Sequence, residues 1–550
     1  MEKRVLWAVL LSIAVMYGYS FLVTPPSRQK NAQMQRPVQQ QLSAAKPVAP
    51  IVQAPEMVEN QPVKGTAIAA PGKDVVVETD LYTAVFSSSG ASLRKFLLKK
   101  YTTTTAPDAK PIALIDEKSP ENFSLKTEGS GLPIDPAGVY SVNADALKVA
   151  KGEKKSLEFV LRSNSGDYVK KTYTFSGDGY GIALDEQVGN TTGFPQQGSL
   201  LLVEKNHFEP IPGESRYDVH GPTTFADNAL QTQKFADLAK GTKTFSKGVL
   251  WSGFEDKYFL GAAIGVNSSI ATVQIKQKNA YVENVISSPQ IALAPGASAT
   301  VSYRLYFGPK DLDILKAQGN RLEEVIDLGW FSAIAKPLLH ILKFFYKYTG
   351  NYGVAIIIIT VIIKALFYPL TSHQFKSMKD MQKLQPKMAE LKEKYKNDRD
   401  AMNRAVMELY KTHKVNPMGG CLPMVIQIPV FFALYKALMF SIELRHAHFF
   451  LWIKDLSAPD ALFGIIPKGL PLLGGMPLGP LPLLMGATMV IQQKMTPSNM
   501  DPAQARIMMA LPFIFTFMFL NFPSGLVLYW LVNNVLTIVQ QAFINKKLKD

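Results

Sequence analysis

The chain has 550 residues, a formal net charge of +15 and 47% hydrophobic residues, while only 19% of its residues are charged. This composition argues against an ordinary soluble multidomain protein. The apolar residues are concentrated near the N-terminus and after residue 353, and a more polar stretch of roughly 200 residues separates the two regions. A membrane protein with a large soluble insert is therefore predicted. The single cysteine, Cys421, excludes an intrachain disulfide framework and a cysteine-based zinc site.

Residues 1–24 predict a transmembrane signal anchor. Lys3 and Arg4 precede an apolar run of about 19 residues, which is long enough to cross a bilayer core of about 30 Å. A cleaved signal peptide is the alternative, but no small-x-small cleavage site follows the run. The two cations favour a cytoplasmic N-terminus by the positive-inside rule. Residues 25–72 are rich in Pro, Gln and Ala and predict an extended tether.

Residues 73–312 predict a β-sandwich on the far side of the membrane. Apolar and polar residues alternate in several short segments separated by Gly, Pro and Asn, which is typical of half-buried strands. No catalytic signature is present, and His207 and His220 lack ligand spacing, so both are interpreted as surface or loop residues. The alternating apolar residues are Leu157, Phe159 and Leu161, then Val273 and Ile275, then Val301, Tyr303, Leu305 and Phe307.

Residues 313–350 predict connecting helices and an amphipathic helix on the membrane surface. The period changes from two to about 3.6 near residue 311, and residues 330–348 combine an apolar face with Lys336, Lys343 and Lys347. Trp330 and Tyr348 suit the interface at its two ends.

Residues 351–545 predict a helical core, with candidate spans at 354–370, 422–440, 481–493, 507–521 and 526–543. The N-terminal anchor brings the expected number of spans to about six. The loop 371–415 holds 11 Lys or Arg against 6 Asp or Glu, and the tail 546–550 is also basic. Both are expected in the cytoplasm, so both termini should be cytoplasmic.

A cytoplasmic helical hairpin is predicted over 373–415. Apolar residues recur every three or four positions on both sides of a polar turn near Asp398, and the outer face is basic. This face is either simply solvated, or it contacts anionic lipid, ribosomal RNA or a protein partner. Its candidate contact residues are Lys383, Lys387, Lys392 and Arg399.

Four short sequence motifs, together with the order of these segments, indicate a resemblance to a known family. They are YPLT at 368–371, VNPMGGC at 415–421, LWIKDL at 451–456 and FPSGLVLYW at 522–530. With them the chain resembles the Gram-negative form of the YidC/Oxa/Alb superfamily of membrane protein insertases. The resemblance implies a polytopic α-helical inner-membrane protein with a five-helix insertase core, a large periplasmic β-sandwich domain and a cytoplasmic hairpin. It also implies a hydrophilic groove that is open to the cytoplasm and to lipid.

The resemblance implies the site residues as well. Members of the family place a positive residue of the first core helix in the groove, and Lys364 matches it, although most bacterial members carry arginine there. Thr360, Lys364 and Tyr368 are spaced by four and form a polar stripe on one helical face. The remaining groove candidates are Gln427, Trp530, Asn533 and Thr537, for which hydrogen bonds that only serve helix packing are the alternative.

The function implied is that of an insertase and chaperone for nascent membrane proteins, working alone or with the Sec translocon. The ribosome, the signal recognition particle receptor and anionic lipids are further expected partners. No cofactor, metal site or enzymatic activity is predicted, because the sequence contains no H-E-x-x-H, phosphate loop or convincing nucleophile elbow. Two alternatives remain open: a secondary transporter, and a membrane-anchored periplasmic binding protein.

Overall fold

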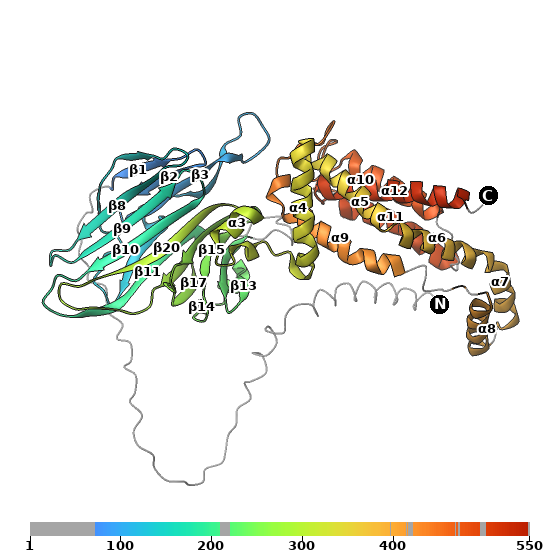
Figure 1. Cartoon of the computed structure of the whole chain (residues 1–550), viewed down its shortest axis with the longest axis horizontal. Helices are drawn as coiled ribbons and strands as arrows, with labels where there is room; N and C mark the ends of the chain where they lie inside the picture. Colours follow the sequence, from blue (N-terminus) through green and yellow to red (C-terminus); the bar gives the residue numbers. More distant parts are fainter. Residues whose placement is uncertain are drawn as a thin grey trace, which may run out of the picture. The chain divides into compact units, whose positions relative to one another are not determined.

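The computed structural model describes residues 72–208, 220–396, 398–413, 415, 422–467, 469–470, 474–495 and 502–547. The predicted anchor at 1–24, nearly all of the tether at 25–72, Cys421 and the end of the basic tail lie outside these residues. Figure 1 shows the strands in blue to green and the helices that follow them in yellow to red. We call the strand-rich part the β-domain, and the helices from α4 onward the helical region.

The β-domain contains three sheets. Every strand pair in the described part of the chain is antiparallel except β1 with β7. The five-stranded sheet has the order β4 (Pro111–Asp116), β3 (Ser92–Thr102), β2 (Tyr82–Ser87), β1 (Asp74–Glu78), β7 (Ala146–Lys148). The nine-stranded sheet has the order β13 (Ala229–Thr232), β12 (Gly221–Ala226), β15 (Trp251–Glu255), β16 (Phe259–Gly265), β20 (Ser298–Pro309), β10 (Gly181–Gly189), β9 (Tyr168–Ser176), β8 (Lys154–Arg162), β6 (Ser141–Val142). The six-stranded sheet has the order β14 (Lys243–Phe245), β17 (Thr272–Lys278), β18 (Tyr281–Ser287), β11 (Gln196–His207), β19 (Ile291–Leu293), and β5 (Lys126–Ser130) pairs with β11.

One face of the nine-stranded sheet packs against both smaller sheets. The rings of Phe86 on β2 and Tyr173 on β9 lie 4.6 Å apart, and Thr127 on β5 donates a hydrogen bond to Glu186 on β10. Tyr173 and Glu186 point to the same face, because Tyr173 lies opposite Leu184 in the register and Glu186 is two residues further on. The alternation predicted for this domain is confirmed at Leu157, Phe159, Val273, Ile275, Tyr303 and Leu305, which are all buried.

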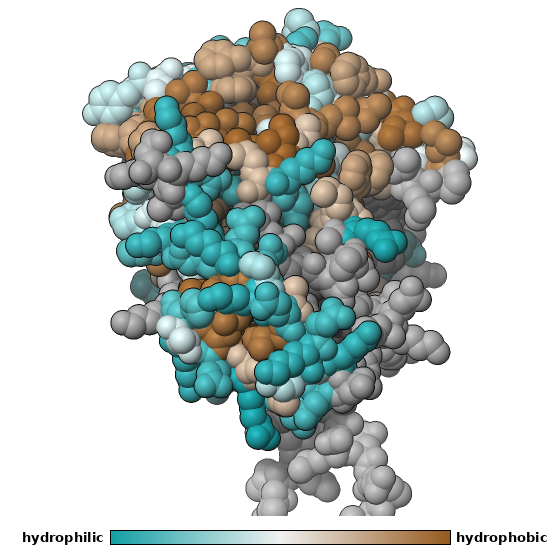
Figure 2. All heavy atoms as spheres, turned by 90° about the vertical axis from the view of Figure 1, so that its right-hand side faces the viewer, coloured by the Kyte–Doolittle hydropathy of each residue, from teal (hydrophilic) through white to brown (hydrophobic). Residues whose placement is uncertain are grey.

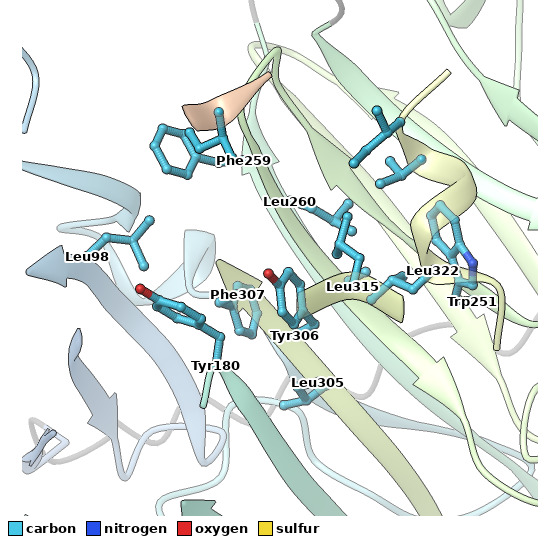
Figure 3. Packing of buried hydrophobic residues seen from close by; sticks show 14 of the residues in the cluster. Leu98, Tyr180, Trp251, Phe259, Leu260, Leu305, Tyr306, Phe307, Leu315 and Leu322 are labelled. Carbon is cyan, nitrogen blue, oxygen red and sulfur yellow. The ribbon is translucent and has the colours of Figure 1, made fainter. Parts of the chain in front are cut away.

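Short helices cover the second face of the same sheet. They are α3 (Leu312–Gln318), whose first turn is capped by the Asp311 side chain, and η3 (Leu322–Val325). Figure 3 shows Leu315 of α3 beside Leu260 and Tyr306, and Leu322 beside Trp251. The β-domain therefore continues into its first helices without a break in the apolar core. Two further short elements are η2 (Pro120–Asn122) and α2 (Phe235–Leu238).

The helical region begins with η4 (Gly329–Phe331) and the amphipathic α4 (Ser332–Thr349). Within it α5 packs against α4 and α12, α9 packs against α4, and α10 packs against α12. The remaining elements are α5 (Tyr352–Leu366), α6 (Tyr368–Lys383), α7 (Gln385–Lys394), α8 (Arg399–Thr412), α9 (Leu422–Phe440), η6 (Ile442–Leu444), α10 (Pro480–Met495), α11 (Pro502–Phe519) and α12 (Ser524–Lys547).

The prediction of one continuous helix over 354–370 is wrong. Helix α5 ends at Leu366, and α6 leaves it at an angle of 61°. Pro369 explains the break, because proline lacks the amide hydrogen of a regular helix and disfavours helical geometry at the preceding residue. The bend follows Lys364 by less than one turn, so Lys364 lies in the last turn of the straight helix α5.

The helical region carries many apolar side chains on its outside. By length and composition α12 can cross a membrane, the bent pair α5 and α6 is a second candidate, and Gln427–Phe440 and Arg506–Phe519 are shorter apolar segments. Figure 2 shows hydrophobic side chains gathered over the upper part of one face, at the height of α10 and α12 in Figure 1, with hydrophilic ones below. The exposed apolar residues include Val361, Ile362, Leu366, Leu483, Leu484, Phe513, Ile514, Phe517, Val535, Val539 and Phe543.

Candidate substrate-binding site among the helices

Lys364 reaches from α5 to α12. Asn351 caps the start of α5 by accepting a hydrogen bond from the Val354 amide at 3.2 Å, and the apolar residues that follow pack the helix against α4 and α12. Lys364 lies in the last turn, and its Nζ donates a hydrogen bond to Thr537 Oγ1 at 2.8 Å. The Thr537 hydroxyl in turn donates to the Asn533 carbonyl at 2.6 Å. The lysine is thus held by a hydroxyl whose own proton is already engaged.

A second polar contact joins α9 to α12. Gln427 Nε2 donates to Asn533 Oδ1 at 3.5 Å, which is a long hydrogen bond. Since Asn533 lies one turn before Thr537 on α12, the two contacts are neighbours along that helix. Four of the seven predicted groove residues, Lys364, Gln427, Asn533 and Thr537, are therefore brought together by three different helices.

The other three predicted residues lie elsewhere or contact other groups. Thr360 is 1% exposed, and its hydroxyl donates to the Ile356 carbonyl of the same helix. Tyr368 begins α6 beyond the bend and is exposed, so it does not continue the stripe of α5. The Trp530 ring packs between the rings of Phe431 and Phe519, each with its centroid 4.8 Å away. Trp530 therefore forms an apolar boundary one turn before Asn533.

Two polar contacts between α10 and α12 were not predicted. Asn534 Nδ2 donates to Thr488 Oγ1 at 3.2 Å, and Gln541 Nε2 donates to the Met495 carbonyl at 2.7 Å. Asn534 and Gln541 are nearly fully buried. Their spacing of seven residues, which places both on one face of a mostly apolar helix, is the signal that sequence inspection could have used.

The charge of Lys364 has no acidic partner within the helices around it. The sequences of α5, α9, α10, α11 and α12 contain no Asp or Glu. The hydrogen-bond acceptor of Lys364 in the described structure is the neutral hydroxyl of Thr537. A partly buried cation with only a neutral partner attracts an acidic group that comes from elsewhere.

Helices α7 and α8 contact each other with their chains running in opposite directions. Lys387 near the start of α7 lies 2.9 Å from His413 after the end of α8, and the Tyr410 hydroxyl contacts the Met388 sulfur. Of the predicted contact residues, Lys383 is exposed and pairs with Asp380 at 3.2 Å, and Lys387 is exposed. The side chains of Lys392 and Arg399 lie outside the described part of the structure.

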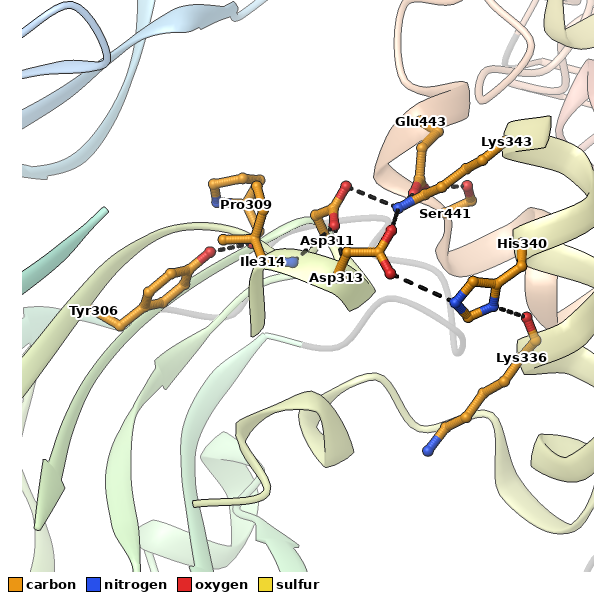
Figure 4. A network of polar contacts seen from close by, with 10 residues as sticks. All are labelled: Tyr306, Pro309, Asp311, Asp313, Ile314, Lys336, His340, Lys343, Ser441 and Glu443. Carbon is orange, nitrogen blue, oxygen red and sulfur yellow. Dashed lines mark hydrogen bonds and ion pairs between the residues drawn. The ribbon is translucent and has the colours of Figure 1, made fainter. Parts of the chain in front are cut away.

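A cluster of charges around Lys343 links α4 to its neighbours. Lys343 Nζ lies 3.1 Å from Asp311, 2.7 Å from Asp313 and 2.8 Å from Glu443, and Figure 4 shows the three carboxylates converging on it. His340 adds a contact to Asp313 at 3.5 Å. Burial alone lowers the pKa of Lys343, but Glu443, Asp313 and Asp311 raise it by more, so its pKa lies above the usual range. We call Lys343, Asp311, Asp313 and Glu443 the Lys343 cluster.

Comparison with known proteins shows to which family the chain belongs. The family model described as "60Kd inner membrane protein" matches residues 344–550, and the model "YidC periplasmic domain" matches residues 74–341. This chain belongs to the YidC family. The matches confirm the resemblance inferred from the four sequence strings, and they make the strand-rich part a periplasmic domain.

The similar proteins extend over the full length of the chain. A "Membrane protein insertase YidC" of Geotalea uraniireducens (strain Rf4) is 56% identical over 549 residues and covers 100% of both chains. The protein of the same name from Pelobacter propionicus (strain DSM 2379 / NBRC 103807 / OttBd1) is 54% identical over 552 residues, again with 100% of both chains covered. A solved structure titled "Active YidC insertase crystal structure with the first transmembrane domain resolved" is 19% identical, covers 86% of this chain and 94% of that chain, and has a TM-score of 0.35.

Proposed function

We propose that this chain is an inner-membrane insertase in which Lys364 attracts acidic or polar segments of a new membrane protein into the helical region. Insertion of membrane proteins is the activity in the names of its full-length relatives, and it is not an enzymatic reaction. The proposal is carried by one observation: Lys364 lies among helices that offer it a neutral hydroxyl and no carboxylate.

The energetic benefit arises because polar groups of the protein replace part of the water that a polar segment loses when it enters the membrane. A charged side chain at the centre of a bilayer costs about 3 kcal/mol on insertion scales and more in simulations. Lys364, Thr537, Asn533 and Gln427 together supply a cation, one hydroxyl group and two amides that partly compensate an acidic tail. In our proposal these groups line the hydrophilic groove and lower the barrier, while no energy-rich cofactor is consumed.

The apolar segment of the substrate needs a different surface. Leu366 at the end of α5 and many exposed residues of α11 and α12, such as Phe513 and Val539, are apolar. A hydrophobic helix that leaves the polar residues therefore meets hydrocarbon-like side chains and then lipid. Trp530 and its aromatic neighbours separate the polar contacts from the Phe519 end of α11. This separation of polar from apolar residues favours release of the substrate helix toward lipid over its passage through the membrane.

The expected topology and partners extend this proposal. The N-terminal anchor and α5, α9, α10, α11 and α12 are the six proposed spans, with both termini and the α7–α8 pair in the cytoplasm. The exposed basic residues Lys383 and Lys387 are proposed to meet anionic lipid or the ribosome. Sec translocon subunits, the signal recognition particle receptor and a chaperone role toward inserted proteins are further proposals on the family relationship.

The test is insertion of a single-span protein with an acidic N-terminal tail into proteoliposomes. Lys364→Arg should retain insertion because the cation is kept, Lys364→Ala should lower it by about tenfold, which corresponds to about 1.4 kcal/mol, and Lys364→Glu should abolish it. A substrate whose tail carries amides in place of carboxylates should respond much less. The control is Lys436→Ala, since Lys436 on α9 lies over the Phe440 ring at 5.0 Å and contacts none of the four polar residues. Equal insertion by all variants with both substrates would exclude a role for the charge of Lys364.

A further inference from the structure

The chain between α9 and α10 ends in a narrow ribbon of backbone. The Phe463 amide donates to the Leu478 carbonyl at 2.9 Å, and the Leu478 amide donates back to the Gly464 carbonyl at 2.9 Å. Ile466 and Met476 are joined at 2.9 Å, and Ile465 and Pro477 form a β-bridge. Gly464 and Gly475 have φ values of +90° and +86°, which residues with a side chain rarely adopt. We call the described residues of this segment, 461–467, 469–470 and 474–479, the apolar ribbon.

Several large side chains of the apolar ribbon are hydrophobic and exposed. Leu462 is 53% exposed, Phe463 60%, Ile465 69% and Leu470 51%. Lys468 is the single charged residue in the sequence from 461 to 479. Four large apolar residues on one short segment form the kind of contiguous patch that soluble surfaces avoid. An apolar partner is therefore needed to explain their exposure.

The base of the apolar ribbon is fixed to the ends of two proposed spans. Asp460 is 5% exposed, and its Oδ2 accepts hydrogen bonds from the Leu481 amide at 2.8 Å and the Trp452 indole at 3.2 Å. The Ser524 amide at the start of α12 donates to the Ala458 carbonyl at 2.8 Å. A side chain at position 479 would lie 2.1 Å from the Asp460 carboxyl carbon, so only glycine fits there. These contacts hold the ribbon at the first residues of α10 and α12.

We propose that the apolar ribbon lies in the periplasmic leaflet of the bilayer and binds lipid acyl chains. Three observations favour lipid as the partner. The ribbon continues into Leu483 and Leu484, the exposed apolar residues of the first turn of α10. Several of its described backbone amides and carbonyls pair with each other, which lowers the cost of placing them in hydrocarbon. No described residue of the ribbon carries a charge, so placing these residues in hydrocarbon requires no desolvation of a charged group.

The consequence for the molecule is a second membrane contact on the side of the β-domain. The ribbon would hold the periplasmic ends of α10 and α12 at a constant depth while segments pass near Lys364 on the cytoplasmic side. This inference rests on α10 and α12 being spans and is independent of the role proposed for Lys364.

The test uses single spin labels in the full chain, reconstituted in lipid vesicles with Cys421→Ser as background. Labels are placed by Ile465→Cys and Leu462→Cys in the ribbon. Phe513→Cys on α11, at a position 58% exposed, is the lipid-facing reference, and Phe194→Cys in the β10–β11 loop, at a position 80% exposed, is the aqueous reference. Collision rates with oxygen, which concentrates in lipid, and with a water-soluble nickel chelate report the surroundings of each label.

Both ribbon labels should collide with oxygen as the Phe513→Cys label does and should be shielded from the nickel chelate at least about tenfold relative to the Phe194→Cys label. Accessibility to the nickel chelate comparable to the aqueous reference would overturn the proposal. Shielding from both reagents would overturn it as well, because it would mean that protein, either this chain or a second copy, covers the ribbon. Insertion activity of each labelled chain, measured in the same vesicles, ensures that a folded protein is compared.

Discussion

Glu204 is an acid buried inside the β-domain, and no cation pairs with it among the residues that the structure describes. It is 3% exposed, its Oε2 accepts a hydrogen bond from Asn284 at 2.7 Å, and its Oε1 has no hydrogen-bond partner among the described residues. Burial raises the pKa of Glu204 to about 8, although the Asn284 hydrogen bond works against this shift. At neutral pH the folded domain therefore keeps a proton that the unfolded chain releases.

The stability of the β-domain should consequently fall as pH rises from about 4.5 to about 8, because in this window the unfolded state has lost the proton and the folded state still binds it. The full loss should be on the order of 5 kcal/mol. Thermal unfolding of the detergent-solubilised chain at several pH values measures this loss of stability. Amide hydrogen exchange of β11 at the same pH values assigns the loss to the β-domain. Glu204→Gln should remove the slope, and the exposed Glu158→Gln should leave it unchanged. A native chain without the slope would show that the acid is not buried.

Lys171 and Glu186 form an ion pair that is fully buried between the sheets. Their charged atoms lie 3.3 Å apart, and both side chains are 0% exposed. Lys171→Met should destabilise the β-domain by about 3–5 kcal/mol, because it leaves Glu186 buried without its cation. Lys171→Met combined with Glu186→Leu should recover most of this loss. The neighbouring Lys170→Met removes a partly exposed pair with Glu158 and should cost less than about 1 kcal/mol. Urea dependence of hydrogen exchange in β9 and β10 compares the variants, and additive effects of the first two changes would argue against their coupling.

At the scale of elements, α4 depends on charges contributed by segments far away in the chain. Lys343→Ala should leave Asp311 and Glu443, both largely buried, without a cation and should weaken the packing of α4 by about 1–3 kcal/mol. Amide hydrogen exchange in α4 should then become faster, and exchange in β9 should not change. Lys347→Ala removes an exposed lysine of the same helix and is the matched control. If both variants exchange alike, the Lys343 cluster adds nothing to the position of α4.

The positions of the apolar helices were largely predictable, but the break between α5 and α6 was not predicted. Helix α9 has the bounds expected for it, and α10 extends the expected 481–493 by one residue at its start and two at its end. Long apolar runs have few alternatives to a helix, which explains this agreement. The run at 354–370 is equally apolar, but Pro369 overrides hydrophobicity and ends α5 at Leu366.

The candidate site was predictable as a set of residues and less so as contacts. Thr360 and Lys364 lie on the same helix, α5, as their spacing predicted. Tyr368 was expected on the same helical face, but it lies beyond the bend at the start of α6. The Lys364–Thr537 hydrogen bond depends on how α5 and α12 are rotated against each other, which no spacing within one helix specifies. The same holds for Lys343, whose partner Glu443 lies 100 positions further along the sequence. All of these charges were visible in the sequence, but their pairing is a property of the fold.

At the scale of the whole molecule, the question is which part performs insertion. The four connected polar residues lie in α5, α9 and α12, so a chain lacking residues 74–309 keeps all of them, and it also keeps the Lys343 cluster. It loses the hydrogen bond from Arg445 to the Thr102 carbonyl at 2.6 Å, which joins the loop after α9 to β3. Insertion into proteoliposomes should remain within about threefold of the full chain, which corresponds to less than about 1 kcal/mol in the barrier. Adding Lys364→Glu to the deletion should abolish insertion, as in the full chain. If the deleted chain is as helical as expected but inserts nothing, the activity resides in the β-domain, and the membrane-anchored binding protein becomes the better description.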